Sequence, residues 1–263
     1  MKLAKTSRGG LRVAALLVVL GMFTAKPEPP PRASDSMAGG ARRPILLELF
    51  TSEGCSSCPP ADRLLEAFDR TQPVSGAELI VLSEHVDYWN RLGWTDPFSS
   101  ALFTQRQQDY VTQLHLDGAY TPQLVIDGQS DVVGSDERAA RSAILKAEMR
   151  SKAAIALKAR HSGANVEVQL GVSGASRGTD VYVVLADDHA QSHVTRGENS
   201  GHILRHVAVV RTLLLAGKTD AQGAFARDLS LPLKDVTIGA WRVVVFLQDS
   251  GSRHVLGAAE TRP

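Results

Sequence analysis

The chain has 263 residues, of which 43% are hydrophobic and 22% are charged. That apolar share is typical of globular proteins and excludes a largely disordered chain, while two cysteines are too few for a disulfide scaffold of this length. With 29 basic and 28 acidic side chains and 5% aromatic residues, the composition also excludes the basic, base-stacking surface of a nucleic-acid-binding protein.

The N-terminal segment has the pattern of an export signal. Residues 1–12 hold basic side chains and no acidic one, and the apolar run Val13–Phe23 follows them. A basic start and an apolar stretch of roughly 7–15 residues are typical of a secretory signal, whereas a spanning helix needs about 20. We predict a signal peptide over residues 1–25, a flexible linker over 26–43, and a periplasmic or secreted bacterial protein. An uncleaved membrane anchor is the alternative.

Between residues 44 and 151, strand and helix patterns alternate. The apolar runs at Ile45–Phe50 and at the beginning of Glu78–Trp89 predict strands that are buried on both faces. Three stretches predict helices, which are Pro60–Arg70, Pro97–His115 and Asp136–Arg150. Gln123–Ser135 predicts a hairpin. The alternation predicts an α/β domain over residues 44–151.

After residue 151 the hydrophobic period changes to two. Strand-like runs follow one another, separated by Gly, Ser, Asp and Asn: IALKAR, NVEVQLGV, DVYVVLAD, HVAVVRTLLL, AFARDLSL, WRVVVFLQ and HVLGAAE. Short strands at this spacing without a helical pattern favour a sandwich. We predict an all-β sandwich-like domain over residues 152–263.

The two cysteines lie three residues apart, between the first predicted strand and the first predicted helix. Pro59 and Pro60 lack backbone donors, which only the first turn of a helix tolerates, so Cys55 and Cys58 lie at the helix start. The positive end of the helix dipole favours a thiolate there. The pattern predicts a Cys55–Cys58 disulfide in a thiol-disulfide oxidoreductase that needs no cofactor, with Cys55 attacking a substrate and Cys58 resolving the mixed disulfide.

Other residues of this segment are candidates for the same site. Thr121-Pro122 precedes a predicted strand, where a cis proline leaves main-chain groups of Thr121 free to pair with an extended substrate. Glu48, in an otherwise apolar strand, is a candidate proton acceptor for Cys58. Tyr88 and Trp89 are candidates for lining a substrate groove, with packing in the interior as the alternative.

The order of strand, CxxC, helix, Thr-Pro, hairpin and helix resembles the thioredoxin-like superfamily over about residues 44–150. More narrowly, four segments resemble a family of exported bacterial proteins, domain of unknown function 1223: LELFTSEGCSSCPPAD, SEHVDYWNRLGWTDPFSS, YTPQLVIDG and RGENSGHILRHVAVVR. The resemblance implies a thioredoxin-like fold with an added β domain and carries no established activity. As partners we expect protein thiols and disulfides and a redox partner, with no nucleic acid, and a membrane only if the N-terminal segment stays uncleaved.

Other functions fit the same cysteines. A disulfide that never turns over is one alternative. A non-catalytic binding protein is another, either a Cu(I) carrier that uses Cys55, Cys58 and His85, or a partner-binding module built on the β domain.

The stretch Asp187–Arg205 is a predicted loop. Four of the eight histidines lie in it or directly after it, namely His189, His193, His202 and His206. Connections of this length are often functional. A metal site and an ordinary solvated loop are two interpretations. The third is a loop that covers the cleft between the two predicted domains, using Arg196, Glu198, Asn199 and Arg205.

Overall fold

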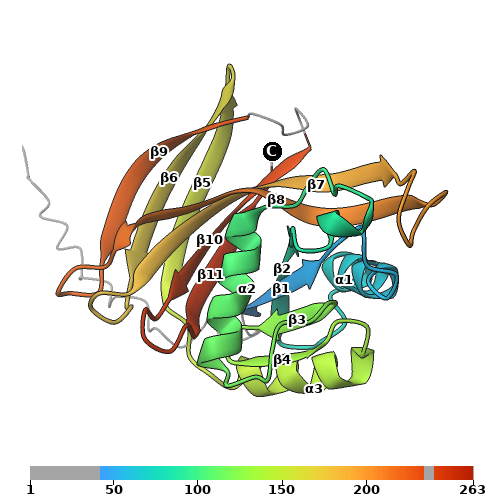
Figure 1. Ribbon diagram of the computed structural model, residues 1–263. Coiled ribbons are helices and arrows are strands. Elements are labelled where there is room, and N and C mark those ends of the chain that lie inside the picture. Colours follow the sequence, from blue (N-terminus) through green and yellow to red (C-terminus); the bar gives the residue numbers. More distant parts are fainter. Residues whose placement is uncertain (1–41, 234–239, 263) are drawn as a thin grey trace, which may run out of the picture. The chain divides into compact units, whose positions relative to one another are not determined.

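The computed structural model describes residues 42–233 and 240–262, so the predicted signal peptide and nearly all of the predicted linker lie outside the described residues. Gly40–Pro263 form one compact unit, shown in Figure 1. Its helices are α1 (Pro59–Thr71), the short 3-10 helix η1 (Asn90–Leu92), α2 (Ala101–Gln113) and α3 (Glu137–Glu148). Its strands are β1 (Arg43–Thr51), β2 (Ala77–His85), β3 (Gln123–Ile126), β4 (Ser130–Val133), β5 (Ala154–Ser162), β6 (Asn165–Ser173), β7 (Asp180–His193), β8 (Ile203–Lys218), β9 (Phe225–Pro232), β10 (Trp241–Gln248) and β11 (Val255–Thr261).

Eight of these strands form one mixed sheet in the order β11-β10-β7-β8-β2-β1-β3-β4, and three form a second sheet in the order β5-β6-β9. β1 pairs with β2 in parallel and with β3 in antiparallel orientation. Its continuous apolar sequence fits this central position, because both faces of the strand are covered. β2 pairs in parallel with β8, where Ser83 lies opposite Val209. Strands from both halves of the chain therefore share one sheet.

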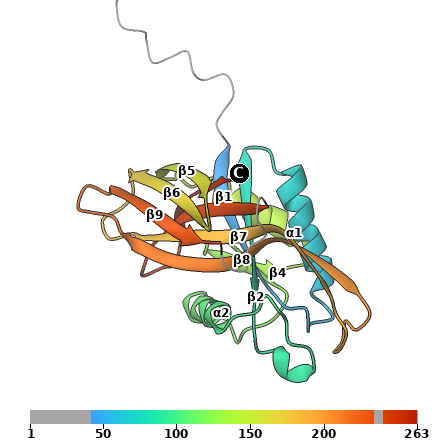
Figure 2. The same cartoon turned by 90° about the horizontal axis from the view of Figure 1, so that it is seen from above.

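Helices and the second sheet cover the two faces of the large sheet (Figures 1 and 2). On one face, Leu47 and Leu49 of β1 pack with residues of α1 and α3. The three-stranded sheet packs against β7 and β10 in a separate core around Trp241. On the opposite face, Leu46 of β1 packs with Phe103 of α2. Since neighbouring residues of a strand point to opposite faces, odd and even positions of β1 meet different helices.

The predicted fold class, an α/β thioredoxin-like domain followed by an all-β sandwich-like domain, is wrong. The described residues are mostly β, with three α-helices, and the parallel pairing of β2 with β8 joins both predicted domains in one eight-stranded mixed sheet. Periodicity identifies a strand but does not say which edge it pairs with, which explains the error. The predicted boundary between residues 151 and 152 lies in the connection between α3 and β5.

Most of the predicted Asp187–Arg205 loop is also strand. β7 extends to His193 and β8 begins at Ile203, which leaves a connection over residues 194–202. The side chains alternate between half-buried and exposed along the last part of β7, so this hairpin has little of the apolar signal that marks a strand.

Helix ends lie close to the predicted ones with one exception. Ser100 forms the N-cap of α2, and its side chain accepts a hydrogen bond from the Leu102 N–H at 3.2 Å, so the helix begins after the predicted Pro97. The helices of the described part are all too short or too polar to cross a membrane.

Candidate functional site

The cysteines lie at the beginning of α1 and form the predicted disulfide. Cys55 and Cys58 are bonded to each other, with Cα atoms 5.4 Å apart. Cys58 is the N-cap residue of α1, and Pro59 and Pro60 occupy the next positions, where no backbone donor is needed. Both cysteines are fully buried, although Ser56 and Ser57 between them are exposed.

The loop before β3 lies against this motif. The Thr121-Pro122 peptide bond is cis, and the Ser57 hydroxyl donates to the Thr121 carbonyl at 3.5 Å. Trp89 Nε1 donates to Thr121 Oγ1 at 2.9 Å, while Tyr88 donates to Gln107 Oε1 at 3.2 Å. The structure thus brings Thr121 and Trp89 beside the cysteines. Tyr88 and Trp89 are both half-buried and pack on the core around Phe50.

Glu48 lies on the other face of the sheet, away from α1. Its carboxylate accepts hydrogen bonds from Arg106 Nε at 2.6 Å and from the Tyr110 hydroxyl at 2.5 Å, both on α2. The neighbouring Leu47 and Leu49 point to α1, which carries Cys58, so the alternation along β1 turns Glu48 to the opposite side. This geometry does not support Glu48 as the proton acceptor of Cys58.

A second carboxyl shares the Glu48 environment. Glu84 is fully buried, and neither of its oxygens has a hydrogen-bond partner among the described residues. Burial, followed by the charge of Glu48, holds the pKa of Glu84 well above its usual range. Arg106 Nε lies 3.6 Å from Glu84 Oε1, and the guanidinium also stacks over Phe246, with 5.1 Å between its carbon and the ring centroid. This cluster belongs to the interior of the fold.

The sequence did not point to Glu53, which connects four segments at the cysteine motif. Its buried carboxylate accepts hydrogen bonds from Trp94 Nε1 at 2.8 Å, from the Ser192 hydroxyl and from His206 Nε2 at 3.2 Å. Its backbone N–H donates to Asp96 Oδ2 at 2.8 Å. Residues from β7 and β8, in the second half of the chain, therefore complete the surroundings of the motif.

His206 is a buried cation between two carboxylates. Its Nε2 contacts Glu53, and its Nδ1 lies 3.7 Å from Asp62 Oδ2. Burial alone would lower the pKa of His206, but the Asp62 and Glu53 carboxylates outweigh it and raise the pKa to about 10. The imidazole is therefore protonated at neutral pH.

His85, the residue of the alternative copper site, pairs with other side chains. Its Nδ1 lies 2.7 Å from Asp96 Oδ2 and its Nε2 lies 3.3 Å from the Ser83 hydroxyl. Burial acts to raise the pKa of Asp96, but His85 and backbone donors lower it overall. Within the described ranges, no group of three or more His, Cys, Asp or Glu side chains is placed to hold a metal ion. The side chains of Cys55, Cys58 and His85, the alternative copper ligands, therefore do not converge on one metal position in the described structure.

Residues 194–202, which we call the covering loop, lie over the cysteine motif. Asn199 Nδ2 donates to the carbonyl oxygens of Glu53 and Cys55 at 2.8 and 3.0 Å. Glu198 Oε2 accepts from the Ser56 N–H at 3.1 Å, and hydrogen bonds from Ser56 lower the pKa of this carboxyl. Gly197 approaches Trp94 so closely that an added Cβ would lie 3.2 Å from the Trp94 Cβ.

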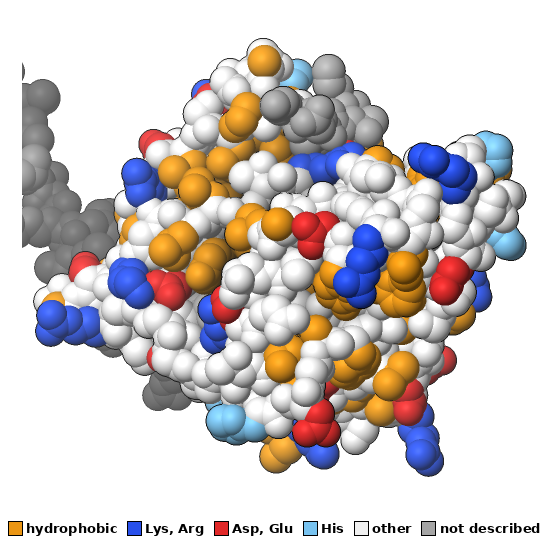
Figure 3. Space-filling model, viewed as in Figure 1, with side chains coloured by type: hydrophobic (Ala, Val, Ile, Leu, Met, Phe, Trp, Pro, Cys, Tyr) orange, Lys and Arg blue, Asp and Glu red, His pale blue; other side chains and the backbone are white. Residues whose placement is uncertain are grey.

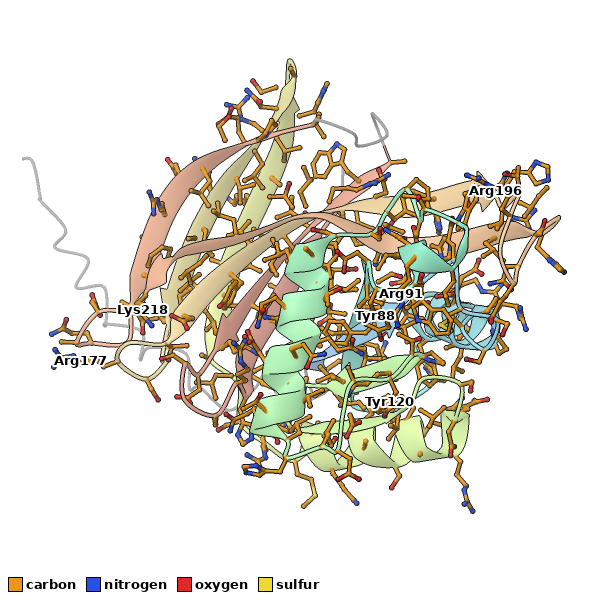
Figure 4. The ribbon with its side chains drawn as sticks, in the orientation of Figure 1. Tyr88, Arg91, Tyr120, Arg177, Arg196 and Lys218 are labelled. Carbon is orange, nitrogen blue, oxygen red and sulfur yellow. A yellow bond between two sulfur atoms is a disulfide. The ribbon has the colours of Figure 1, made fainter. Side chains whose placement is uncertain are left out.

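Two of the four residues predicted for such a loop, Glu198 and Asn199, therefore contact the site. Arg196 lies at the far end of the β7–β8 hairpin (Figure 4), and Arg205 Nε donates to Gln191 at 3.4 Å. Of the four histidines, His206 is buried at the site, whereas the others are exposed: His189, His193 and His202. On the face shown in Figure 3, basic and acidic side chains are interspersed, in line with the balanced composition.

A sequence model of the family described as "Protein of unknown function (DUF1223)" matches residues 46–248. The chain belongs to this family. The match includes the cysteine motif, the covering loop and His206, so the family's sequence pattern spans every part of the site. A comparison with curated proteins found no match.

Solved structures include proteins that are similar to this chain in fold. Protein AGR_C_4864 from Agrobacterium tumefaciens is 26% identical, with a TM-score of 0.65 over 84% of this chain and 95% of that one. A domain of the outer membrane lipoprotein Omp28 from Porphyromonas gingivalis is 14% identical, with a TM-score of 0.28 over 43% of this chain and 88% of that one. The E. coli curli protein CsgC is 14% identical, with a TM-score of 0.23 over 43% of this chain and all of that one (100%).

Proposed function

We propose that this DUF1223 protein is a thiol-disulfide oxidoreductase. Cys55 as a thiolate attacks one sulfur of a substrate disulfide, forms a mixed disulfide and releases the other substrate sulfur as a thiolate. Cys58 then attacks Cys55, which forms the Cys55–Cys58 bond and releases the second substrate sulfur. The reverse sequence oxidises a substrate dithiol.

The observation that carries the proposal is the disulfide between the only two cysteines of the sequence, directly before α1. A bridge across so short a loop contributes little to stability through chain entropy, which argues against a purely structural role. The helix start stabilises a thiolate at Cys55 in the reduced state. The Thr121 carbonyl beside Ser57 belongs to a loop suited to contact a substrate chain.

Substrates and location are part of the same proposal. Protein thiols and disulfides or small thiols are the substrates, and a second redox protein or small thiol exchanges electrons with the Cys55–Cys58 pair. The basic and apolar start of the chain supports export to the periplasm or the medium, where a disulfide persists.

Cys55→Ser is expected to reduce catalysed insulin reduction and catalysed dithiol oxidation to the rates measured without protein, because the attacking sulfur is lost. Cys58→Ser, the matched control at the second position, is expected to accumulate a mixed disulfide with the substrate, visible by mass spectrometry of the unreduced sample. The proposal fails if the native chain catalyses neither reaction, or if Cys55→Ser retains the native rate.

A further inference from the structure

His206 is a charged group at the cysteine motif that the proposed exchange reaction does not yet use. Its side chain is 1% exposed and comes from β8, far in sequence from both cysteines. Its Nδ1 has no hydrogen-bond partner among the described residues and lies 3.7 Å from Asp62 Oδ2. This ion pair, together with the contact of Nε2 to Glu53, holds the positive imidazole against Asp62 in the first turn of α1.

Asp62 connects His206 to Cys58. Cys58 already has helical backbone angles, φ −79° and ψ −37°, and its carbonyl accepts the Asp62 N–H at 3.1 Å. Residues four apart on a helix present their side chains on the same face, with Cβ atoms about 5–6 Å apart. Cys58 and Asp62 are both buried on that face. The Thr51 hydroxyl donates to Asp62 Oδ1 at 3.0 Å and fixes the carboxylate.

Other charged groups also face His206. The ring centroid of His85, which pairs with Asp96, lies 4.6 Å from that of His206. A groove of about 370 Å³ next to His206 is lined by groups of both signs and by a polar amide: Glu66 of α1, His189 and Gln191 of β7 and Arg205 of β8. The two directly facing carboxylates, Glu53 and Asp62, exceed the single positive charge of His206. Loss of the His206 charge would therefore leave both negative charges uncompensated beside Cys58.

We propose that His206 is a positioning residue that acts through Asp62 to set how readily the Cys58 thiol gives up its proton, and thereby the rate of the resolving step. The inference rests on the proposed exchange reaction. In that step the Cys58 thiol loses a proton, its sulfur bonds to Cys55, the bond between Cys55 and the substrate sulfur breaks, and the leaving thiolate gains a proton. The positive imidazole lowers the cost of the Cys58 thiolate, whereas the Asp62 carboxylate alone would raise it.

The test measures Cys58 alone, in the Cys55→Ser background, by the pH dependence of its alkylation with iodoacetamide. Adding His206→Gln keeps a donor toward Glu53 and removes the charge, so we expect a thiol pKa about one unit higher and about tenfold less thiolate at neutral pH. Adding Asp62→Asn removes the negative charge, so we expect a shift in the opposite direction. His193→Gln, an exposed histidine of the same hairpin, is the matched control and leaves the profile unchanged.

Shifts of opposite sign are the signature that a merely structural role would not produce. Identical profiles for His206→Gln and His193→Gln, or equal shifts for His206→Gln and Asp62→Asn, would overturn the inference. If either variant fails to fold, NMR of the ring nitrogens in the native chain decides: the His206 signals change between the oxidised and reduced forms if the inference holds and stay constant if it does not. Alkylation requires no catalysis, so a native chain without exchange activity would refute the proposed function while these shifts are still measured.

Discussion

Arg106→Leu is expected to lower the free energy of unfolding by about 3–5 kcal/mol at neutral pH, because it leaves buried acidic groups without their counter-ion. Arg106 is 4% exposed and pairs with Glu48 at 2.6 Å and with Glu84 at 3.6 Å. Urea unfolding followed by circular dichroism measures the loss. Lys218→Met is the control. Lys218 is half-exposed at the C-terminal end of β8 (Figure 4), and its surface pair with Asp180 contributes about 0–1 kcal/mol.

The sign of the pH dependence follows from the raised pKa of Glu84. A carboxyl whose pKa is higher in the folded than in the unfolded chain favours folding fully below its unfolded value, about 4.3, and loses this contribution as the pH rises through its folded pKa. Without Arg106 the folded pKa of Glu84 rises further, so the cost of Arg106→Leu grows as the pH rises through the native folded pKa of Glu84. A cost that is the same at every pH, or no larger than that of Lys218→Met, would contradict this account.

The local parts of the site follow from sequence, because short-range physics fixes them. Within a helix, the two prolines after Cys58 fit only the first turn, and α1 begins there. The disulfide needs only the three-residue spacing at that turn. The position of Asp62 follows from the same local rule, since it lies one helical turn after Cys58 and shares its buried face.

Contacts between site residues that are far apart in the sequence cannot be predicted from local patterns. Glu53 and His206 meet only because β8 pairs with β2, through a parallel contact at Ser83 and Val209 that no hydrophobic period encodes. The position of Glu48 depends on the face of its strand. Leu47 and Leu49 on either side pack against α1, which places Glu48 on the α2 face. The predicted fold class is wrong because a change of hydrophobic period does not prevent strands on its two sides from pairing.

Asn199→Ala is expected to raise the rate at which a small phosphine reductant opens the Cys55–Cys58 disulfide by about tenfold. Both sulfurs are buried, and the covering loop is held to the Glu53 and Cys55 carbonyls by the Asn199 amide. Losing these two hydrogen bonds costs the closed loop about 1–3 kcal/mol, and each 1.4 kcal/mol changes the open population tenfold. Stopped-flow tryptophan fluorescence reports the reaction, since Trp89 and Trp94 both contact residues around the motif.

Ser200→Ala is the matched control, because its hydroxyl donates to the Thr195 carbonyl at 3.0 Å inside the same loop and is exposed. It is expected to leave the reduction rate unchanged. If the disulfide of Asn199→Ala and that of Ser200→Ala are both reduced at the native rate, the reductant reaches the disulfide without movement of the covering loop. If only Asn199→Ala is faster, opening of this loop limits access to Cys55. A substrate of the proposed exchange reaction would then have to displace the Asn199 amide before its own sulfur reaches the buried pair.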